Sequence, residues 1–179
     1  MSNIIILAGS ERKDGNTDML VDAFKKGAAK KNKVEVISVR SHDINPCIGC
    51  NSCFTRLGNE CFQKDDMQMV YEKLKTADVL VIASPVYFYG ISAQLKAIID
   101  RLHTPMQNEF PIKKLALILV GAATLPELFD SIKLQYKLVL SFFHLEDAGM
   151  VLVQGAKDIG DVKNTDGPDR AYELGLSIG

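Results

Sequence analysis

Short apolar runs alternate with amphipathic stretches along this 179-residue chain. Such runs are typical of buried strands in a parallel sheet, and the amphipathic stretches between them are typical of helices that cover the sheet. The pattern predicts an α/β fold with a doubly wound, five-stranded parallel sheet and helices on both faces. The expected strands are 3–8, 33–39, 78–83, 115–120 and 149–154, and the expected helices are 17–31, one that begins near 65–66, 92–102, 126–145 and 169–176.

Length and composition fit a single domain over residues 1–179, because 47% hydrophobic content is enough to bury a full core. The longest apolar run, Leu115 to Ala123, is about half of the roughly 18 residues that a membrane span needs. The net charge is −1 and the basic residues are scattered, which argues against a nucleic-acid partner. Because the N-terminus does not resemble a secretory signal, we expect a cytoplasmic protein.

All four cysteines of the chain, Cys47, Cys50, Cys53 and Cys61, fall within one predicted loop, residues 41–64. The spacing C-x2-C-x2-C-x7-C brings four sulfur donors within reach of one metal centre. In the reducing cytosol, clustered cysteines usually indicate metal or redox chemistry rather than disulfides. A 4Fe-4S cluster, a zinc ion and a dithiol or structural role all remain open.

The loop after the first expected strand, residues 9–17, contains features that suit a phosphate group. Glycines allow close backbone approach, Ser10, Asn16 and Thr17 offer short donors, Arg12 adds positive charge, and a helix N-terminus follows. A P-loop and a strict dinucleotide fingerprint are both missing. The alternative is an ordinary turn in which Thr17 is the helix N-cap.

Three adjacent aromatic residues, Tyr87, Phe88 and Tyr89, follow the third expected strand. Aromatic side chains at that edge of the sheet can form the wall of a site for a flat ring such as an isoalloxazine. Core packing and a dimer contact are the alternatives. The loop after the fourth strand, 121–124, is small enough to let the edge of a cofactor approach.

The stretch 84–101 resembles the second flavin-contacting segment of the NADPH-dependent FMN reductases, and 9–17 resembles their phosphate loop. The cysteines followed by Asp65-Asp66-Met67 are similar to the branch that includes the iron-sulfur flavoproteins. The resemblance implies a flavodoxin-like fold, FMN as cofactor, and a homodimer or dimer of dimers. It also implies phosphate contacts from Ser10, Arg12, Asn16 and Thr17, and ring contacts from Pro85, Val86, Tyr87, Phe88, Gly90 and Gly121.

We therefore expect an FMN-dependent oxidoreductase that takes electrons from NAD(P)H or another donor and passes them to a quinone-like molecule or a redox protein. The flavin carries the chemistry, so no catalytic side chain is expected. His42, His103 and His144 are interpreted as surface, capping or structural residues, and Asp100-Arg101 as a helix-end charge arrangement. One alternative is an electron-transfer protein with a 4Fe-4S cluster on the four cysteines, and another is a non-enzymatic zinc-binding module.

Overall fold

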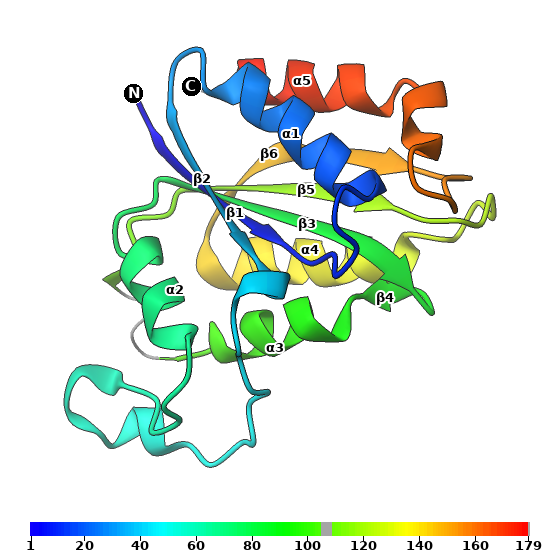
Figure 1. Cartoon of the computed structure of the whole chain (residues 1–179). Coiled ribbons are helices and arrows are strands. Elements are labelled where there is room, and N and C mark those ends of the chain that lie inside the picture. The colour runs from blue at the N-terminus through cyan, green and yellow to red at the C-terminus, as the bar shows by residue number, and fades with distance from the viewer. Residues whose placement is uncertain (105–108, 179) are drawn as a thin grey trace.

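The computed structural model describes residues 1–104 and 109–178, and it confirms the expected α/β fold. Five parallel strands form a sheet in the order β2-β1-β3-β5-β6, and the short β4 pairs antiparallel with β3 (Figure 1). The strands are β1 (Asn3–Ala8), β2 (Lys33–Ser38), β3 (Val79–Tyr87), β4 (Gly90–Ile91), β5 (Lys114–Val120) and β6 (Glu146–Val153). The helices are α1 (Asn16–Ala28), α2 (Met67–Leu74), α3 (Ala93–Arg101), α4 (Asp130–Phe143) and α5 (Gly167–Ser177), with 3-10 turns at Val39–Ser41, Ser52–Phe54, Leu57–Asn59 and Asp161–Asn164.

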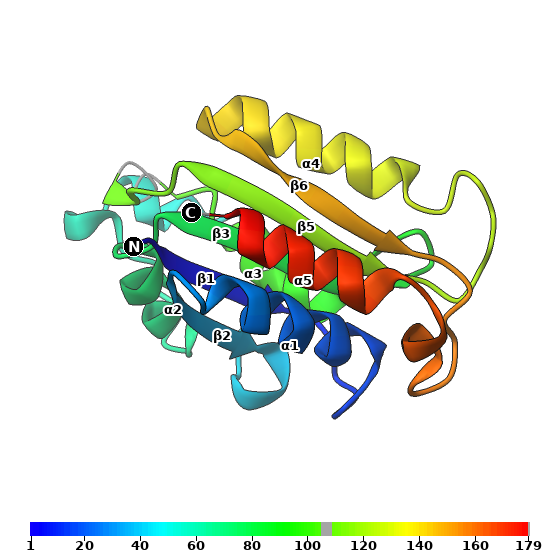
Figure 2. The ribbon, with the colours of Figure 1, turned by 90° about the horizontal axis from the view of Figure 1, so that it is seen from above.

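Helices α1 and α5 cover one face of the sheet, and α2, α3 and α4 cover the other (Figures 1 and 2). The side chains of β1 show why helices pack on both faces of the sheet. Ile4 and Ile6 pack in the apolar core beneath α1 and α5, whereas Ile5 and Leu7 pack in the core beneath α2, α3 and α4. Successive residues of a strand point to opposite faces, so a strand that is apolar throughout is buried on both sides.

Helices α1 and α5 are in close backbone contact through two glycines. A Cβ atom on Gly27 would lie 2.1 Å from the Tyr172 carbonyl oxygen, and one on Gly175 would lie 2.2 Å from the Phe24 carbonyl oxygen. No larger residue fits at either position without moving the helices apart. This contact fixes α1, and therefore the loop that leads into it, against the sheet.

Several element boundaries differ from the predicted ones. Strand β3 runs to Tyr87 rather than residue 83, because it pairs with β5 as far as Pro85 and Val120 and then turns back into β4. Strand β6 begins at Glu146 rather than residue 149, where a bulge opposite Leu115 shifts its register. Helix α4 begins at Asp130 rather than residue 126.

The predicted loop around Pro105 and Pro111 lies partly outside the described residues, since Pro105 is not among them. Within the described ranges, no helix has both the length and the apolar character needed to cross a membrane.

Candidate functional site

The predicted phosphate loop leaves the carboxyl end of β1 and enters α1, which begins at Asn16 with Gly15 as its N-cap. Thr17 is therefore inside the first helical turn, and the alternative in which it is the N-cap is wrong. Ser10 and Thr17 are 3% and 2% exposed. The first N–H groups of a helix have no partner within it and carry the positive end of its dipole, so this loop presents donors suited to an anion.

Gly9 joins this loop to the aromatic segment that follows β3. Its N–H donates to the Ala83 carbonyl oxygen (2.8 Å). A Cβ atom at Gly9 would lie 2.8 Å from Leu95 Cβ and from Ser92 Oγ, at the start of α3. The two loops that the sequence singled out therefore lie side by side, because β1 and β3 are neighbours in the sheet.

The side chain of Asn16 holds the phosphate loop against the chain that follows β6. Its Nδ2 donates to the carbonyl oxygens of Asp158 (2.8 Å) and Ala156 (3.3 Å), and its Oδ1 accepts from the N–H groups of Gly160 (3.0 Å) and Val162 (3.3 Å). The amide is fully used in these bonds. Asn16 can therefore meet a phosphate through its backbone N–H, while its side chain shapes the loop.

Arg40, which follows β2, was not recognised from the sequence. Its guanidinium donates to the carbonyl oxygens of Ser10 (2.7 Å) and Arg12 (2.9 Å) and forms an ion pair with Asp18 (2.9 Å). The Arg12 side chain is exposed and donates to the Lys157 carbonyl oxygen (3.2 Å). Arg40 thus fixes the backbone of the loop, and Arg12 lies on its open side.

The aromatic segment is a hairpin at the end of β3. Tyr87 pairs with Gly90, and the two residues between them, Phe88 and Tyr89, have positive φ angles of 46° and 65°. Positive φ is rare for bulky residues and often marks a functional site. Tyr87, Phe88 and Tyr89 are 46%, 97% and 50% exposed, so these rings do not belong to the core. Of the other predicted ring contacts, Pro85 is buried, while Val86 and Gly90 are partly exposed.

Three serines hold this hairpin in place, and the sequence analysis did not single them out. The buried Ser84 Oγ donates to the Pro85 carbonyl oxygen (2.7 Å) and accepts from the Ser92 N–H (3.0 Å). Ser92 Oγ accepts from Leu95 N–H (3.3 Å) and caps α3. The Ser131 hydroxyl on α4 donates to the Tyr89 carbonyl oxygen.

Gly121, at the end of β5, completes the group of loops at this edge. A Cβ atom there would lie 2.7 Å from Leu128 Cδ2 and 3.5 Å from Val86 Cβ, so a larger residue would have to displace the Leu128 side chain. Its N–H donates to the Val153 carbonyl oxygen (2.9 Å), and its own carbonyl accepts from Ala156 (3.1 Å). The loops after β1, β3 and β5 thus converge at the carboxyl edge of the sheet, where ligands bind in open α/β folds (Figure 1).

A cavity of about 750 Å³ lies not at this edge but between α3 and α4. Apolar side chains such as Leu80, Ile82 and Phe142 line it. It contains neither the phosphate loop nor the aromatic hairpin. We therefore locate the candidate site by the converging loops rather than by cavity size.

The cysteine segment is a loop whose two ends are joined by carboxylates. The Asp43 N–H donates to Asp66 Oδ2 (2.8 Å), and the Asn45 N–H donates to Asp65 Oδ2 (2.9 Å). The helix expected to begin near 65–66 begins at Met67. Asp66 is at the N-cap position of α2 without a side-chain cap bond, and Asp65 Oδ1 accepts from the Met67 N–H (3.2 Å).

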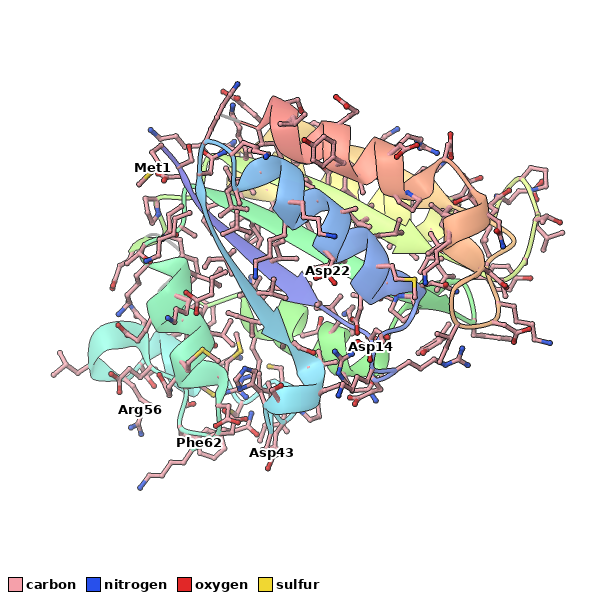
Figure 3. All side chains as sticks on the ribbon, turned by 45° about the horizontal axis from the view of Figure 1, so that its top comes forward. Met1, Asp14, Asp22, Asp43, Arg56 and Phe62 are labelled. Carbon is pink, nitrogen blue, oxygen red and sulfur yellow. The ribbon has the colours of Figure 1, made fainter. Side chains whose placement is uncertain are left out.

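Figure 3 separates this cysteine loop, labelled by Asp43, Arg56 and Phe62, from the phosphate loop, labelled by Asp14. The aromatic hairpin precedes α3, whereas the cysteine loop meets its last residue, Arg101. The nine residues of α3 therefore put roughly 12 Å of helix between the two regions, at 1.5 Å per residue.

Asp100 and Arg101 do not form the expected helix-end charge arrangement. Asp100 pairs with Lys96 at the surface, whereas Arg101 is buried and forms an ion pair with Asp65, each side chain being 2% exposed. Burial alone would raise the pKa of Asp65, but the hydrogen bond and charge of Arg101, with the Asn45 N–H, lower it. The sequence showed no sign of this pair, because its members are far apart along the chain.

All four cysteines are free, with Cys47 and Cys50 exposed and Cys53 and Cys61 partly buried. They line a common cavity of about 140 Å³ together with Arg101. A hydrogen bond with the Ser52 hydroxyl lowers the pKa of the Cys50 thiol. Over residues 1–104 and 109–178, no three His, Cys, Asp or Glu side chains are placed to hold one metal ion.

The three histidines lie outside the converging loops. His42 Nδ1 is 3.7 Å from Asp66 Oδ2, and His144 ends α4 in the left-handed conformation with φ 54°. His103 is exposed, and its ring lies 6.0 Å from that of Phe54 and 5.7 Å from that of Phe142, measured between centroids.

Solved structures share the fold of this chain. An NAD(P)H:quinone oxidoreductase from Methanothermobacter marburgensis superposes with a TM-score of 0.77 over 98% of this chain and 96% of that one, at 15% identity. An FMN-dependent NADH-azoreductase from Bacillus anthracis, solved in complex with FMN, has a TM-score of 0.68 over 98% of each chain, also at 15% identity. At such low identity these likenesses show the flavodoxin-like fold.

Curated relatives are closer in sequence. An iron-sulfur flavoprotein of Methanocaldococcus jannaschii is 40% identical over 111 residues, covering 62% of this chain and 56% of that protein. Another, from Methanosarcina thermophila, is 32% identical over 118 residues, covering 65% and 59%. The chain thus spans little more than half the length of these relatives. The family described as NADPH-dependent FMN reductase matches residues 2–156. That match covers most of the chain and all three converging loops, so the chain belongs to the NADPH-dependent FMN reductase family.

Proposed function

We propose that this chain is an FMN-dependent oxidoreductase that takes electrons from NAD(P)H or another donor and passes them to a quinone-like molecule or a redox protein. One observation carries the proposal. An anion-binding helix start and an exposed aromatic hairpin lie side by side at the carboxyl edge of the sheet. Phosphate and ring are the two parts of FMN that these elements would recognise, and family membership supports the same cofactor.

The residues present fit the group. Gly9, Gly15 and Gly121 lie where backbone must come close to its neighbours. Ser10, Thr17 and the first N–H groups of α1 would bind the phosphate, with Arg12 adding charge from the open side. Tyr87 and Phe88 would form the wall of the ring site, with Pro85, Val86 and Gly90 at its base. Bound FMN would supply hydride and single-electron chemistry, while the chain supplies position and exclusion of water.

Fluorescence titration with FMN and riboflavin tests this assignment, because the two ligands differ in the phosphate alone. We expect FMN to bind more tightly. Arg12→Ala should weaken FMN binding by about 1.5 kcal/mol, the low end for a charge-assisted bond at an exposed site. That loss is about tenfold in Kd. Lys13→Ala, an equal charge change in the same loop, is the matched control. Equal affinities for FMN and riboflavin would contradict the proposal.

A second candidate function is that of an iron-sulfur flavoprotein, in which a 4Fe-4S cluster on Cys47, Cys50, Cys53 and Cys61 passes electrons to or from the flavin. The arrangement of the four free thiols around one cavity favours it. Curated relatives named as iron-sulfur flavoproteins support it. A single zinc ion would need its ligands to converge on one point, and the described residues offer no such group.

Anaerobic reconstitution with iron and sulfide tests the second candidate. We expect about four irons per chain, which is the content of one such cluster, and loss of iron in Cys50→Ser. If the chain retains FMN but takes up no iron, the second candidate is refuted and an FMN-dependent oxidoreductase without a cluster remains.

A homodimer or larger homo-oligomer in the reducing cytosol is the remaining part of the proposal. Besides the aromatic hairpin, α4 exposes Leu134, Leu138 and Phe142 by 60%, 61% and 54%. Contiguous apolar surface of this kind is uncommon on monomers and often marks a protein contact. We infer that a second copy of this chain covers it.

A further inference from the structure

Arg101 is a buried arginine whose bonding within the chain is incomplete. Its Nη1 donates to the Asn45 carbonyl oxygen (3.1 Å) and to the Asp65 carboxylate. Its Nε and Nη2 are buried and have no hydrogen-bond partner in the part of the chain that the structure describes. An unsatisfied buried donor costs about 1–3 kcal/mol, and more when it is charged. Two such donors on one guanidinium indicate an acceptor that is not among the described residues.

The surroundings of Arg101 identify the class of that acceptor. Arg101 and the four cysteines line the same cavity. Burial opposes the charge of Arg101, but Asp65 and, more weakly, Cys61 raise its pKa. The Tyr71 hydroxyl donates to the Arg101 carbonyl oxygen (2.8 Å), which fixes the end of α3 beneath the loop. Sulfur, from the four cysteines or from a group that they hold, is therefore the acceptor that this cavity would bring to Arg101.

We propose that Arg101 donates Nε–H and Nη2–H to sulfur atoms of a 4Fe-4S cluster on the four cysteines and makes that cluster easier to reduce. This inference rests on the second candidate function. One-electron reduction adds one negative charge to the cluster and moves no heavy atom between groups. Hydrogen bonds to the sulfurs and nearby positive charge favour the more negative state.

Asp65 and the Asn45 carbonyl are positioning groups in this arrangement. They hold Nη1, which leaves Nε and Nη2 of the planar guanidinium without a partner among the described residues. Asp65 also offsets part of the positive charge. The directed N–H bonds should therefore account for a large share of the change in cluster potential. Arg101→Lys keeps the charge but not these bonds, so it should preserve the potential only in part.

The test is a redox titration of the reconstituted cluster by electron paramagnetic resonance, in the parent, Arg101→Gln, Arg101→Lys and Arg56→Gln. Arg56 is the matched control, because it lies in the same loop and carries the same charge but is exposed. We expect Arg101→Gln to lower the equilibrium constant for one-electron reduction at least tenfold, which makes the midpoint potential more negative by about 59 mV. Arg101→Lys should lie between Arg101→Gln and the parent, and Arg56→Gln should match the parent.

The possible failures are distinguishable. If the parent takes up no iron, the cluster function fails and this inference fails with it. If the parent takes up iron and folded Arg101→Gln has the parent potential, the role of Arg101 is refuted while the cluster function stands. If both Arg101 variants fail to fold, Arg56→Gln is prepared with a heavy-nitrogen isotope in its arginine guanidinium groups, so that no arginine of the cysteine loop itself carries the label. Magnetic coupling between that isotope and the reduced cluster would support the inference, and its absence would overturn it.

Discussion

Gly9 is the point at which the phosphate loop, β3 and α3 meet, so substituting it tests the geometry of the candidate site. A Cβ atom there would lie 2.8 Å from Leu95 Cβ, Leu95 Cδ2 and Ser92 Oγ. Ordinary carbon–carbon contacts lie at about 3.5–4.0 Å, so Gly9→Ala must displace the loop or the start of α3 by roughly 1 Å. Overpacking of this kind costs about 1–3 kcal/mol. The lower entropy of the unfolded Ala chain returns about 0.4–1 kcal/mol.

We therefore expect Gly9→Ala to lower the free energy of unfolding by about 1–2 kcal/mol, measured by urea unfolding of the FMN-free protein with circular dichroism. Gly90→Ala is the control, because its Cβ would meet nothing closer than the Tyr87 carbonyl oxygen at 3.7 Å. It should be neutral or slightly stabilising. Displacement of the phosphate loop should also weaken FMN binding more than riboflavin binding. A Gly9→Ala protein as stable as Gly90→Ala would refute the argument from close packing.

Three further predictions concern the ring site, the buried ion pair and assembly. Tyr87→Ala should weaken FMN binding while leaving the unfolding midpoint close to that of the parent, because Tyr87 is 46% exposed; a large loss of stability with unchanged affinity would make it a packing residue. Pairing with Arg101 lowers the pKa of Asp65 in the folded state. Its contribution to stability is therefore complete above the ordinary Asp pKa of about 3.9 and is lost as the pH falls through the lower folded value. Urea unfolding over that pH range should show that the free energy of unfolding falls more steeply for the parent than for Asp65→Asn. Parallel plots of that free energy against pH would contradict a stabilising ion pair. Light scattering at micromolar concentration should give at least twice the chain mass, whereas a monomer would contradict the assembly proposed here.

The order of strands and helices along the chain follows from local pattern, because apolar periodicity records how each segment is buried. The exact ends of the strands and helices do not follow from local pattern. Tyr87 belongs to β3 because β4 and β5 offer it and its neighbours pairing partners. Glu146 belongs to β6 because a bulge shifts the register. Such ends depend on hydrogen bonds between segments that are distant in sequence.

The candidate site, like the fold, could be predicted from the sequence only in part. Residue types and their place after predicted strands were enough to select the phosphate loop, the aromatic hairpin and the cysteine cluster. The groups that hold these loops could not be found from the sequence. Arg40 reaches Ser10, Asn16 reaches Asp158, and Arg101 reaches Asp65 across 30, 142 and 36 positions of the chain, respectively. A polar residue alone does not reveal which backbone carbonyl or carboxylate will lie opposite it.

What the sequence by itself determined is therefore the class of fold, the edge of the sheet at which the candidate loops meet, and the four thiols that lie in one loop. These depend on short-range periodicity and on the rule that loops after parallel strands share one edge. Only the tertiary structure decided that the Asp100-Arg101 pair splits, with Asp100 at the surface and Arg101 buried beneath the cysteines. The physical reason is that a guanidinium enters a protein interior only where its charge is paired. The partner, Asp65, lies 36 positions away and is brought there by tertiary contacts, such as the hydrogen bond from Tyr71 on α2 to the Arg101 carbonyl oxygen, rather than by any local pattern.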